Sequence, residues 1–187
     1  MIYVTSDLHF NHNKDFIYKA RGFNSIEEMN EEIIKRWNAT ITPEDTVYIL
    51  GDIALGADLA ASMRLIGRLN GNLYLAIGNH DSDAKIDAYK KANLFKDIQF
   101  GYRLKIKKRV CVLTHYPSIV ANDGDAPTVN LYGHTHQEKN FYKDHWDMYH
   151  VGMDSHDCYP ILIEDALADI RVKRIKYMEE KTNESSS

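Results

Sequence analysis

The chain has 187 residues and a mass of 21.6 kDa, which is enough for one compact domain with a sizeable core. Hydrophobic residues make up 44% and charged residues 27%, a composition that excludes a largely disordered, collagen-like or membrane-spanning protein. The net charge of -4 and the pI of about 6.1 disfavour a role in binding long nucleic acids, because polyanions bind basic surfaces.

Two further features bear on the cellular compartment. The longest apolar runs fall far short of a membrane span, and the first residues lack the basic and apolar regions of a signal peptide. Cys111 and Cys158 have no zinc-type spacing, and we expect both to be free thiols in a reducing compartment. We therefore expect a cytoplasmic protein that does not bind membranes.

The first half of the chain alternates short apolar runs with amphipathic segments. Ser25 and Glu28 have the spacing of a capping box, and the apolar residues that follow recur with a helical period. The alternation predicts, in chain order, a strand at 2–6, a helix at 24–38, a strand at 46–50, a helix at 59–69, a strand at 73–77 and a helix at 82–93.

The second half is richer in strands. Its pattern predicts strands at 100–105, 109–114, 129–132, 148–152 and 160–163. Residues 164–178 fit either a helix or a strand, and the basic cluster Lys105, Lys107, Lys108 and Arg109 is typical of a solvated hairpin turn. These elements favour a layered α/β fold in a single domain at 1–178, with a flexible tail at 179–187.

Polar side chains directly follow five of the expected strands. These groups are Asp7-Leu8-His9, Gly51-Asp52, Gly78-Asn79-His80-Asp81, His115, and Gly133-His134-Thr135-His136. Sites in layered α/β folds assemble at the carboxyl ends of strands, and Asp oxygens with His nitrogens suit divalent transition metals. Strand alternation would place Asp7 and His9 on one side, so that one ion could bind both. Asp81 could instead cap the helix that follows it.

The ordered series Asp7-x-His9, Gly51-Asp52, Gly78-Asn79-His80-Asp81, His115 and Gly133-His134-x-His136 resembles the motifs of the calcineurin-like metallophosphoesterases. Flanking pieces such as Trp37-Asn38 and Val151-Gly-Met-Asp154 resemble the small bacterial and phage members. The resemblance implies a four-layer αββα sandwich of two mixed sheets with a dinuclear metal site at the strand ends. It also implies a phosphoesterase in which a metal-bridging hydroxide attacks phosphorus in line.

The resemblance also implies a role for each motif residue. One ion would bind to Asp7, His9, Asp52 and His136, and a second ion would bind to Asp52, Asn79, His115 and His134. The ions would be divalent transition metals, and the sequence does not choose among Mn, Fe, Ni and Zn. His80 would face the substrate and protonate the leaving group or stabilise its charge.

One departure narrows the substrate class. Protein Ser/Thr phosphatases of this family carry an Asp and an Arg shortly after the Gly-Asp motif, where this chain has Ile53-Ala54-Leu55-Gly56. We therefore expect a small phosphodiester substrate, such as a nucleotide or a cyclic nucleotide. A phosphomonoesterase, a non-catalytic binding protein with this fold, and a nuclease are the alternatives.

Four further residues are candidates for substrate contacts. His12 could face the substrate or be an ordinary loop histidine, and His156 could line the site from a loop at its edge. Asn11 and Arg21 could meet a phosphate, although a surface ion pair is the favoured role for Arg21. We expect the protein to act on its small substrate as a monomer or a homodimer.

Overall fold

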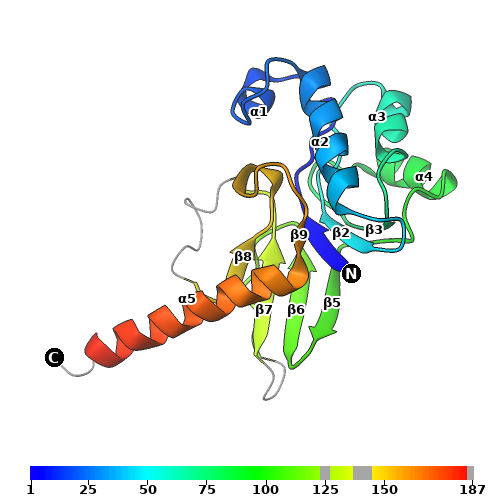
Figure 1. The fold of residues 1–187 in the computed structure, drawn as a ribbon. Coiled ribbons are helices and arrows are strands. Elements are labelled where there is room, and N and C mark those ends of the chain that lie inside the picture. Colours follow the sequence, from blue (N-terminus) through cyan, green and yellow to red (C-terminus); the bar gives the residue numbers. More distant parts are fainter. Residues whose placement is uncertain (123–126, 137–144, 185–187) are drawn as a thin grey trace.

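The computed structural model describes residues 1–122, 127–136 and 145–184 (Figure 1). Its first sheet has five strands in the order β4-β3-β2-β1-β9. Four strands run parallel, and the fifth is antiparallel to β1. The strands are β1 (Ile2–Thr5), β2 (Thr46–Leu50), β3 (Asn72–Ala76), β4 (Asp97–Gln99) and β9 (Ile161–Leu162).

Helices cover the outer face of this sheet. They are α1 (Asp15–Tyr18), α2 (Ile26–Thr40), α3 (Leu59–Ile66) and α4 (Asp83–Lys91). The apolar stripe of α2, including Ile33 and Trp37, packs in one cluster with Ile49 and Leu75 of the sheet. The expected cap is present, because the Ser25 side chain accepts a hydrogen bond from the backbone N–H of Glu28. The Glu28 carboxylate accepts a hydrogen bond from the backbone N–H of Asn24, whereas a capping box predicts the N–H of Ser25 as its donor.

The second sheet has four strands in the order β5-β6-β7-β8. β5 and β6 are antiparallel, whereas β6, β7 and β8 are parallel. The strands are β5 (Gly101–Ile106), β6 (Arg109–Thr114), β7 (Thr128–Tyr132) and β8 (Met148–His150). Its inner face packs against the first sheet in a second core, in which Val4 and Leu50 join Leu113 and Leu131. The predicted α/β fold with two mixed sheets is confirmed.

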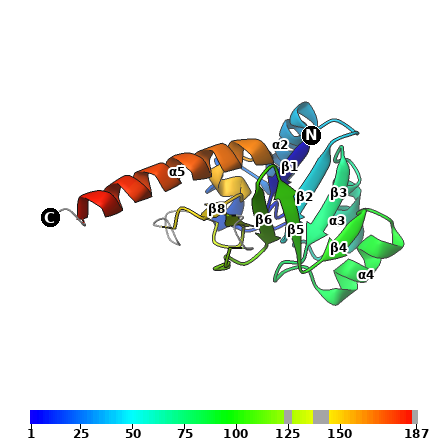
Figure 2. The ribbon, with the colours of Figure 1, turned by 90° about the horizontal axis from the view of Figure 1, so that it is seen from below.

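The ambiguous segment after β9 is a helix, α5 (Ile163–Glu184). Ile163, Ala166 and Ile170 recur with a helical period and are buried in the core between the sheets. The helix projects beyond the body of the molecule (Figures 1 and 2). It includes residues 179–184, which the sequence placed in a flexible tail, and 185–187 lie outside the described residues.

The topology brings the loops of both sheets together. β1, β2 and β3 are parallel neighbours, so the loops that follow them leave the sheet at the same edge. A single bridge between Ser6 and Gly152 links this edge to the chain that follows β8. A short 3-10 helix, Met153–Ser155, then begins beside the same loops. Within the described part of the chain, no helix is both long and apolar enough to cross a membrane.

Candidate metal centre

The loop after β1 places Asp7 and His9 by a backbone conformation that the sequence did not suggest. β1 ends at Thr5, so strand alternation does not orient these side chains. Asp7 and His9 have φ angles of 57° and 54°, in the left-handed region that ordinary residues rarely occupy. Their N–H groups donate to the carbonyls of Gly51 and Asp52, which ties this loop to the loop after β2.

The same conformation recurs at other candidate ligands. Asp52, His134 and His136 have φ angles of 54°, 69° and 56°. A non-glycine residue in a rare backbone conformation costs on the order of 1–3 kcal/mol, and such residues gather at functional sites. Five of the seven candidate ligands have this strained backbone. The strain therefore favours a functional site, in which the positions of the side chains matter more than the local stability of the loops.

The first group of ligand atoms surrounds a buried point between Asp7, His9 and His136. These side chains can each offer one atom, with all three atoms within 4.8 Å of one another. The Oδ1 atom of Asp7 and the Nε2 atom of His9 lie 3.7 Å apart, and both are buried without a hydrogen-bond partner among the described residues. Buried polar atoms rarely lack a partner, so an ion at this point would satisfy both.

The second group consists of side-chain atoms of His115, Asn79 and His134 that face one another. The backbone carbonyl of Leu50 lies 2.8 Å from Nδ1 of His115 and can only accept, so Nδ1 carries the proton and Nε2 presents a lone pair. That Nε2 atom lies 2.8 Å from Oδ1 of Asn79, which is 2.9 Å from Nδ1 of His134. Adjacent ligands of one transition-metal ion are about 3 Å apart when each bond is about 2.1 Å long. The spacing fits a cation between these atoms.

Asp52 lies between the two groups. Its Oδ2 atom is 3.9 Å from Nε2 of His9 and 3.6 Å from Nε2 of His115, one residue from each group. Its Oδ1 atom accepts a hydrogen bond from the backbone N–H of His80, which fixes the carboxylate in this position. Asp52 is therefore within reach of both groups of ligand atoms.

Neighbouring groups fix the orientation of two further histidines. Nδ1 of His136 lies 3.0 Å from Oδ2 of Asp154 and donates to it, so Nε2 is the nitrogen that the neutral ring could offer to an ion. Nδ1 of His9 lies 3.0 Å from Nδ1 of His12, and the two rings stack with centroids 5.1 Å apart. If Nε2 of His9 binds an ion, its Nδ1 proton is donated to His12.

Close backbone approaches hold the loops in place. A Cβ atom at Gly78 would lie 2.3 Å from Oδ1 of Asp52, and one at Gly133 would lie 2.5 Å from Oδ2 of Asp7. Asp81 is buried, and one of its oxygens accepts the N–H groups of both Asp52 and Gly78. Asp81 therefore ties two loops of the centre together and makes no capping bond to α4.

The electrostatics favour the metal-binding protonation states of Asp7, His9 and His134, whereas the hydrogen bond to Asp154 raises the pKa of His136. Burial raises the pKa of Asp7, but its attraction to the imidazoles of His9 and His115 is stronger and brings that pKa to about 2. Burial lowers the pKa of His9 and of His134, which favours their neutral forms. An ionised carboxylate and neutral imidazoles are the ligand forms that bind a divalent cation.

Two histidines border the centre on its exposed side. The side chain of His80 is 42% exposed, and its Nε2 atom lies 3.9 Å from Oδ2 of Asp52. The ring centroid of His12 lies 6.3 Å from that of His80. Burial, followed by the charges of His9 and His80, lowers the pKa of His12 to about 4. Both residues are placed to meet a molecule that reaches the centre.

Arg21, Asn11 and His156 all form hydrogen bonds within the protein, and Arg21 forms the expected ion pair in a buried position. The Arg21 side chain is buried rather than on the surface, and it forms an ion pair with Asp154 at 2.8 Å. Its other hydrogen bonds go to the carbonyls of Asp7 and Leu8 and to the sulfur of Met29, so no donor remains for a phosphate. Asn11 is hydrogen-bonded to Asn30 and Ser62 of the outer helices, and His156 to the carbonyl of His150.

Sequence reasoning gave no role to several residues that shape the centre. Asp154 belongs to a flanking motif with no role predicted from the sequence, yet it joins His136 to Arg21. Phe16 and Tyr116 are exposed aromatic side chains beside the centre, the first against His12 and the second against His134. Exposure beside the centre is what marks these two rings as candidates for substrate contacts. The sequence does not reveal this exposure.

The profile of the calcineurin-like phosphoesterase family matches residues 1–175. The chain belongs to this family. An uncharacterised protein of Methanocaldococcus jannaschii is 44% identical over 81 residues, and this match spans only 43% of the chain and 46% of that protein. The Gene 66 protein of Mycobacterium phage L5 is 25% identical in an alignment 181 residues long. The alignment covers 82% of this chain and 86% of that protein.

A solved structure has a similar fold. A protein of unknown function from Aquifex aeolicus aligns with a TM-score of 0.67 at 25% identity, over 86% of this chain and 94% of that chain. Family membership agrees with the chemistry of the centre, because metal-dependent phosphoester hydrolysis requires clustered carboxylate and imidazole ligands.

Proposed function

We propose that this calcineurin-like phosphoesterase hydrolyses a small phosphodiester at the centre around Asp52, with a nucleotide or a cyclic nucleotide as its substrate. One observation carries the proposal. Lone pairs and carboxylate oxygens converge on both sides of Asp52 Oδ2, with donors turned away toward Leu50 and Asp154. Cations bound between these atoms would satisfy the buried Oδ1 of Asp7 and Nε2 of His9, which have no hydrogen-bond partner among the described residues.

Two divalent ions fit the ligands. Asp7, His9 and His136 would hold one ion, Asn79, His115 and His134 would hold the other, and Asp52 would contribute to both. When bound, the ions would supply Lewis acidity to the phosphoryl oxygens and lower the pKa of the water that attacks phosphorus. Mn, Fe, Ni and Zn all remain candidates for this ligand set.

The proposed role of His80 is to donate a proton. Its side chain is exposed beside Asp52, and its backbone is anchored by the hydrogen bond to Asp52 Oδ1. A proton on its Nε2 atom can pass to the oxygen that leaves phosphorus, which avoids the release of a free alkoxide. His12 would keep the His9 ring in place and present its own edge to the substrate.

The charges around the centre favour a diester over a monoester. A monoester dianion needs more positive charge than a diester monoanion. Arg21 is turned toward Asp154 and backbone carbonyls, and the Lys85 ammonium donates to the carbonyls of Ala54 and His80. The segment where phosphatases carry an arginine contains the buried apolar residues Ile53 and Ala54.

Two exposed aromatic rings support a nucleotide as the substrate. Phe16 is 69% exposed and Tyr116 is 49% exposed, and the two rings lie beside different histidines of the centre. A nucleobase stacks on an aromatic ring with about 1–3 kcal/mol. A base attached to a phosphate at the centre could stack on either ring.

The test compares hydrolysis of a nitrophenyl diester, a nitrophenyl monoester and a small library of nucleotide diesters by the manganese-loaded enzyme. We expect a higher kcat/KM for diesters. Loss of one stacking ring should lower kcat/KM on the best nucleotide by about 5- to 150-fold. Phe16→Ala and Tyr116→Ala test the rings, and Phe100→Ala, which is 85% exposed on another loop, is the control. Preference for the monoester would overturn the proposal.

A cytoplasmic location is part of the same proposal. Cys111 and Cys158 are both buried free thiols, as expected in a reducing compartment.

A further inference from the structure

The outer half of α5 exposes apolar side chains. Ile170 is the last buried residue of this helix, and none of the residues 171–183, whose burial the structure describes, is buried. Val172, Ile175 and Met178 are nevertheless 52%, 50% and 55% exposed. Figure 1 shows this half of the helix extending beyond both sheets.

A partner packed on its apolar face would stabilise this part of the helix. Isolated helices of fewer than about 12–15 residues are marginal in water, because helical stability in proteins comes mainly from packing of an apolar face. The segment after Ile170 is about this long, and it contains apolar residues at helical spacing. Exposed apolar stripes rimmed by charges are typical of interaction surfaces.

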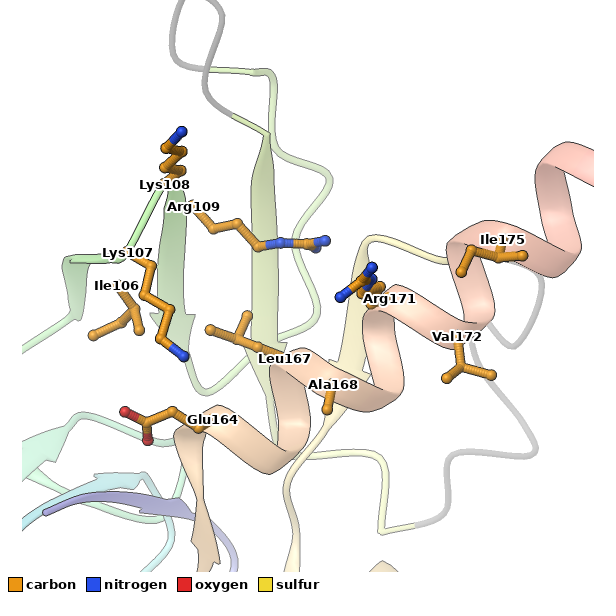
Figure 3. Close-up of a pocket in the computed structure, with 10 residues that line it drawn as sticks. All are labelled: Ile106, Lys107, Lys108, Arg109, Glu164, Leu167, Ala168, Arg171, Val172 and Ile175. Carbon is orange, nitrogen blue, oxygen red and sulfur yellow. The ribbon is translucent and has the colours of Figure 1, made fainter.

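A pocket of about 820 Å³ lies beside this stripe, between α5 and the turn that joins β5 to β6 (Figure 3). Leu167 and Ile175 line it from the helix, together with the Arg171 side chain. Lys107 and Arg109 line it from the turn, which the sequence had assigned to solvent. The pocket thus combines an apolar floor with a basic rim.

Basic residues outnumber acidic ones around the pocket, because Glu164 is the one acidic residue that lines it beside Lys107, Lys108, Arg109 and Arg171 (Figure 3). Burial and the charges of Arg174 and Arg171 lower the pKa of Arg109. Its Nη1 atom is buried without a hydrogen-bond partner among the described residues. An acidic side chain brought in by a partner would satisfy this atom and relieve the repulsion between the arginines.

α5 itself carries an acidic residue that could fill this role in a second copy, which is Glu179. Ile175 shares one face of the helix with the residues three and four positions before and after it, which are Arg171, Val172, Met178 and Glu179. In an antiparallel pair of two such helices centred on Ile175, residues at equal distances before and after the centre face each other. Val172 then meets Met178 of the second copy, and Arg171 meets its Glu179.

We propose that this face of α5 docks on the same face of a second copy of the chain, as an antiparallel helix pair centred on Ile175. The pairing buries the exposed apolar residues and sets acidic residues opposite basic ones at both ends. The residues involved lie outside the centre around Asp52. An experiment can therefore disprove the dimer without disproving the proposed phosphodiesterase activity, and the reverse.

The test measures molar mass by sedimentation equilibrium over a wide range of protein concentration. We expect a monomer–dimer equilibrium for the wild type. Ile175→Asp should be monomeric throughout, and the control Ile119→Asp, altered at a residue that is 75% exposed outside α5, should dimerise like the wild type. Circular dichroism and phosphodiester turnover of each variant report whether the body of the domain has folded.

Charge reversal tests the register of the pair. Arg171→Glu and Glu179→Arg should each raise the dissociation constant by about tenfold, because each places like charges opposite one another twice in the dimer. The double variant R171E/E179R should recover the wild-type constant. A wild type that stays monomeric, a dimer unaffected by Ile175→Asp, or a double variant weaker than both single variants would overturn the proposal. So would a monomer that binds a single-stranded oligonucleotide through the pocket.

Discussion

Replacement of Asp81 by alanine should loosen the two loops that carry Asp52 and Asn79. One oxygen of Asp81 accepts the buried N–H groups of Asp52 and Gly78, at 2.8 and 2.9 Å. Each N–H left without an acceptor costs about 1–3 kcal/mol, so the variant should lose about 2–6 kcal/mol of unfolding free energy. For a chain of this size each kcal/mol lowers Tm by about 2–4 °C.

Asp81→Asn separates the hydrogen bonds from the charge. It keeps an oxygen that can accept both N–H groups, but bonds to a neutral acceptor are about half as strong as those to a carboxylate. We expect its loss to be smaller than that of Asp81→Ala. Asp87→Ala, on the exposed side of α4, is the matched control and should change stability by less than about 0.5 kcal/mol.

Urea unfolding should be measured with a chelator present, because a bound metal would add its own stabilisation to the wild type. A metal titration of the same preparations should then show weaker binding by Asp81→Ala, since Asp52 is no longer fixed by its backbone. The reasoning would be refuted if Asp81→Ala unfolded at the same urea concentration as Asp87→Ala.

Three further substitutions test individual residues. Asp52→Asn should weaken both metal ions, because a neutral amide bridges two cations poorly; full metal content by elemental analysis would disprove its shared role. His80→Ala should keep both metals and lose about 10²–10⁴ in rate, more for an alkoxide leaving group than for a nitrophenolate. Equal losses on both substrates would favour phosphate positioning over proton donation. Asp154→Ala should lower the metal-free unfolding free energy by about 3–5 kcal/mol, because it leaves Arg21 buried and unpaired. A loss no larger than that of Asp87→Ala would contradict this role.

The sequence predicted where the centre lies because strand ends leave a strong pattern. Apolar runs followed directly by Asp, Asn or His can be recognised without coordinates, and parallel strands bring these ends to one edge. The same pattern did not predict how the side chains are oriented. Asp7 and His9 are oriented by left-handed backbone in a loop, and periodicity says nothing about such a conformation.

Contacts between distant residues account for the remaining differences. Arg21 and Asp154 are separated by 133 positions, and nothing in either local sequence identifies their pairing. Asn11 is engaged by Asn30 and Ser62, which come from two helices that pack beside it only in the folded chain. The charged outer half of α5 obscures its helical period, and burial of Ile163, Ala166 and Ile170 decides in favour of a helix.

The central claim is that Asp52 joins two cation sites in one phosphoesterase centre. Anomalous diffraction from crystals of the manganese-loaded protein tests it most directly. We expect two peaks on opposite sides of the Asp52 carboxylate, about 3.5–4 Å apart as in other two-metal hydrolases. One peak should lie beside Asp7, His9 and His136, and the other beside Asn79, His115 and His134. The absence of anomalous density next to Asp52 in a fully loaded crystal would contradict the account.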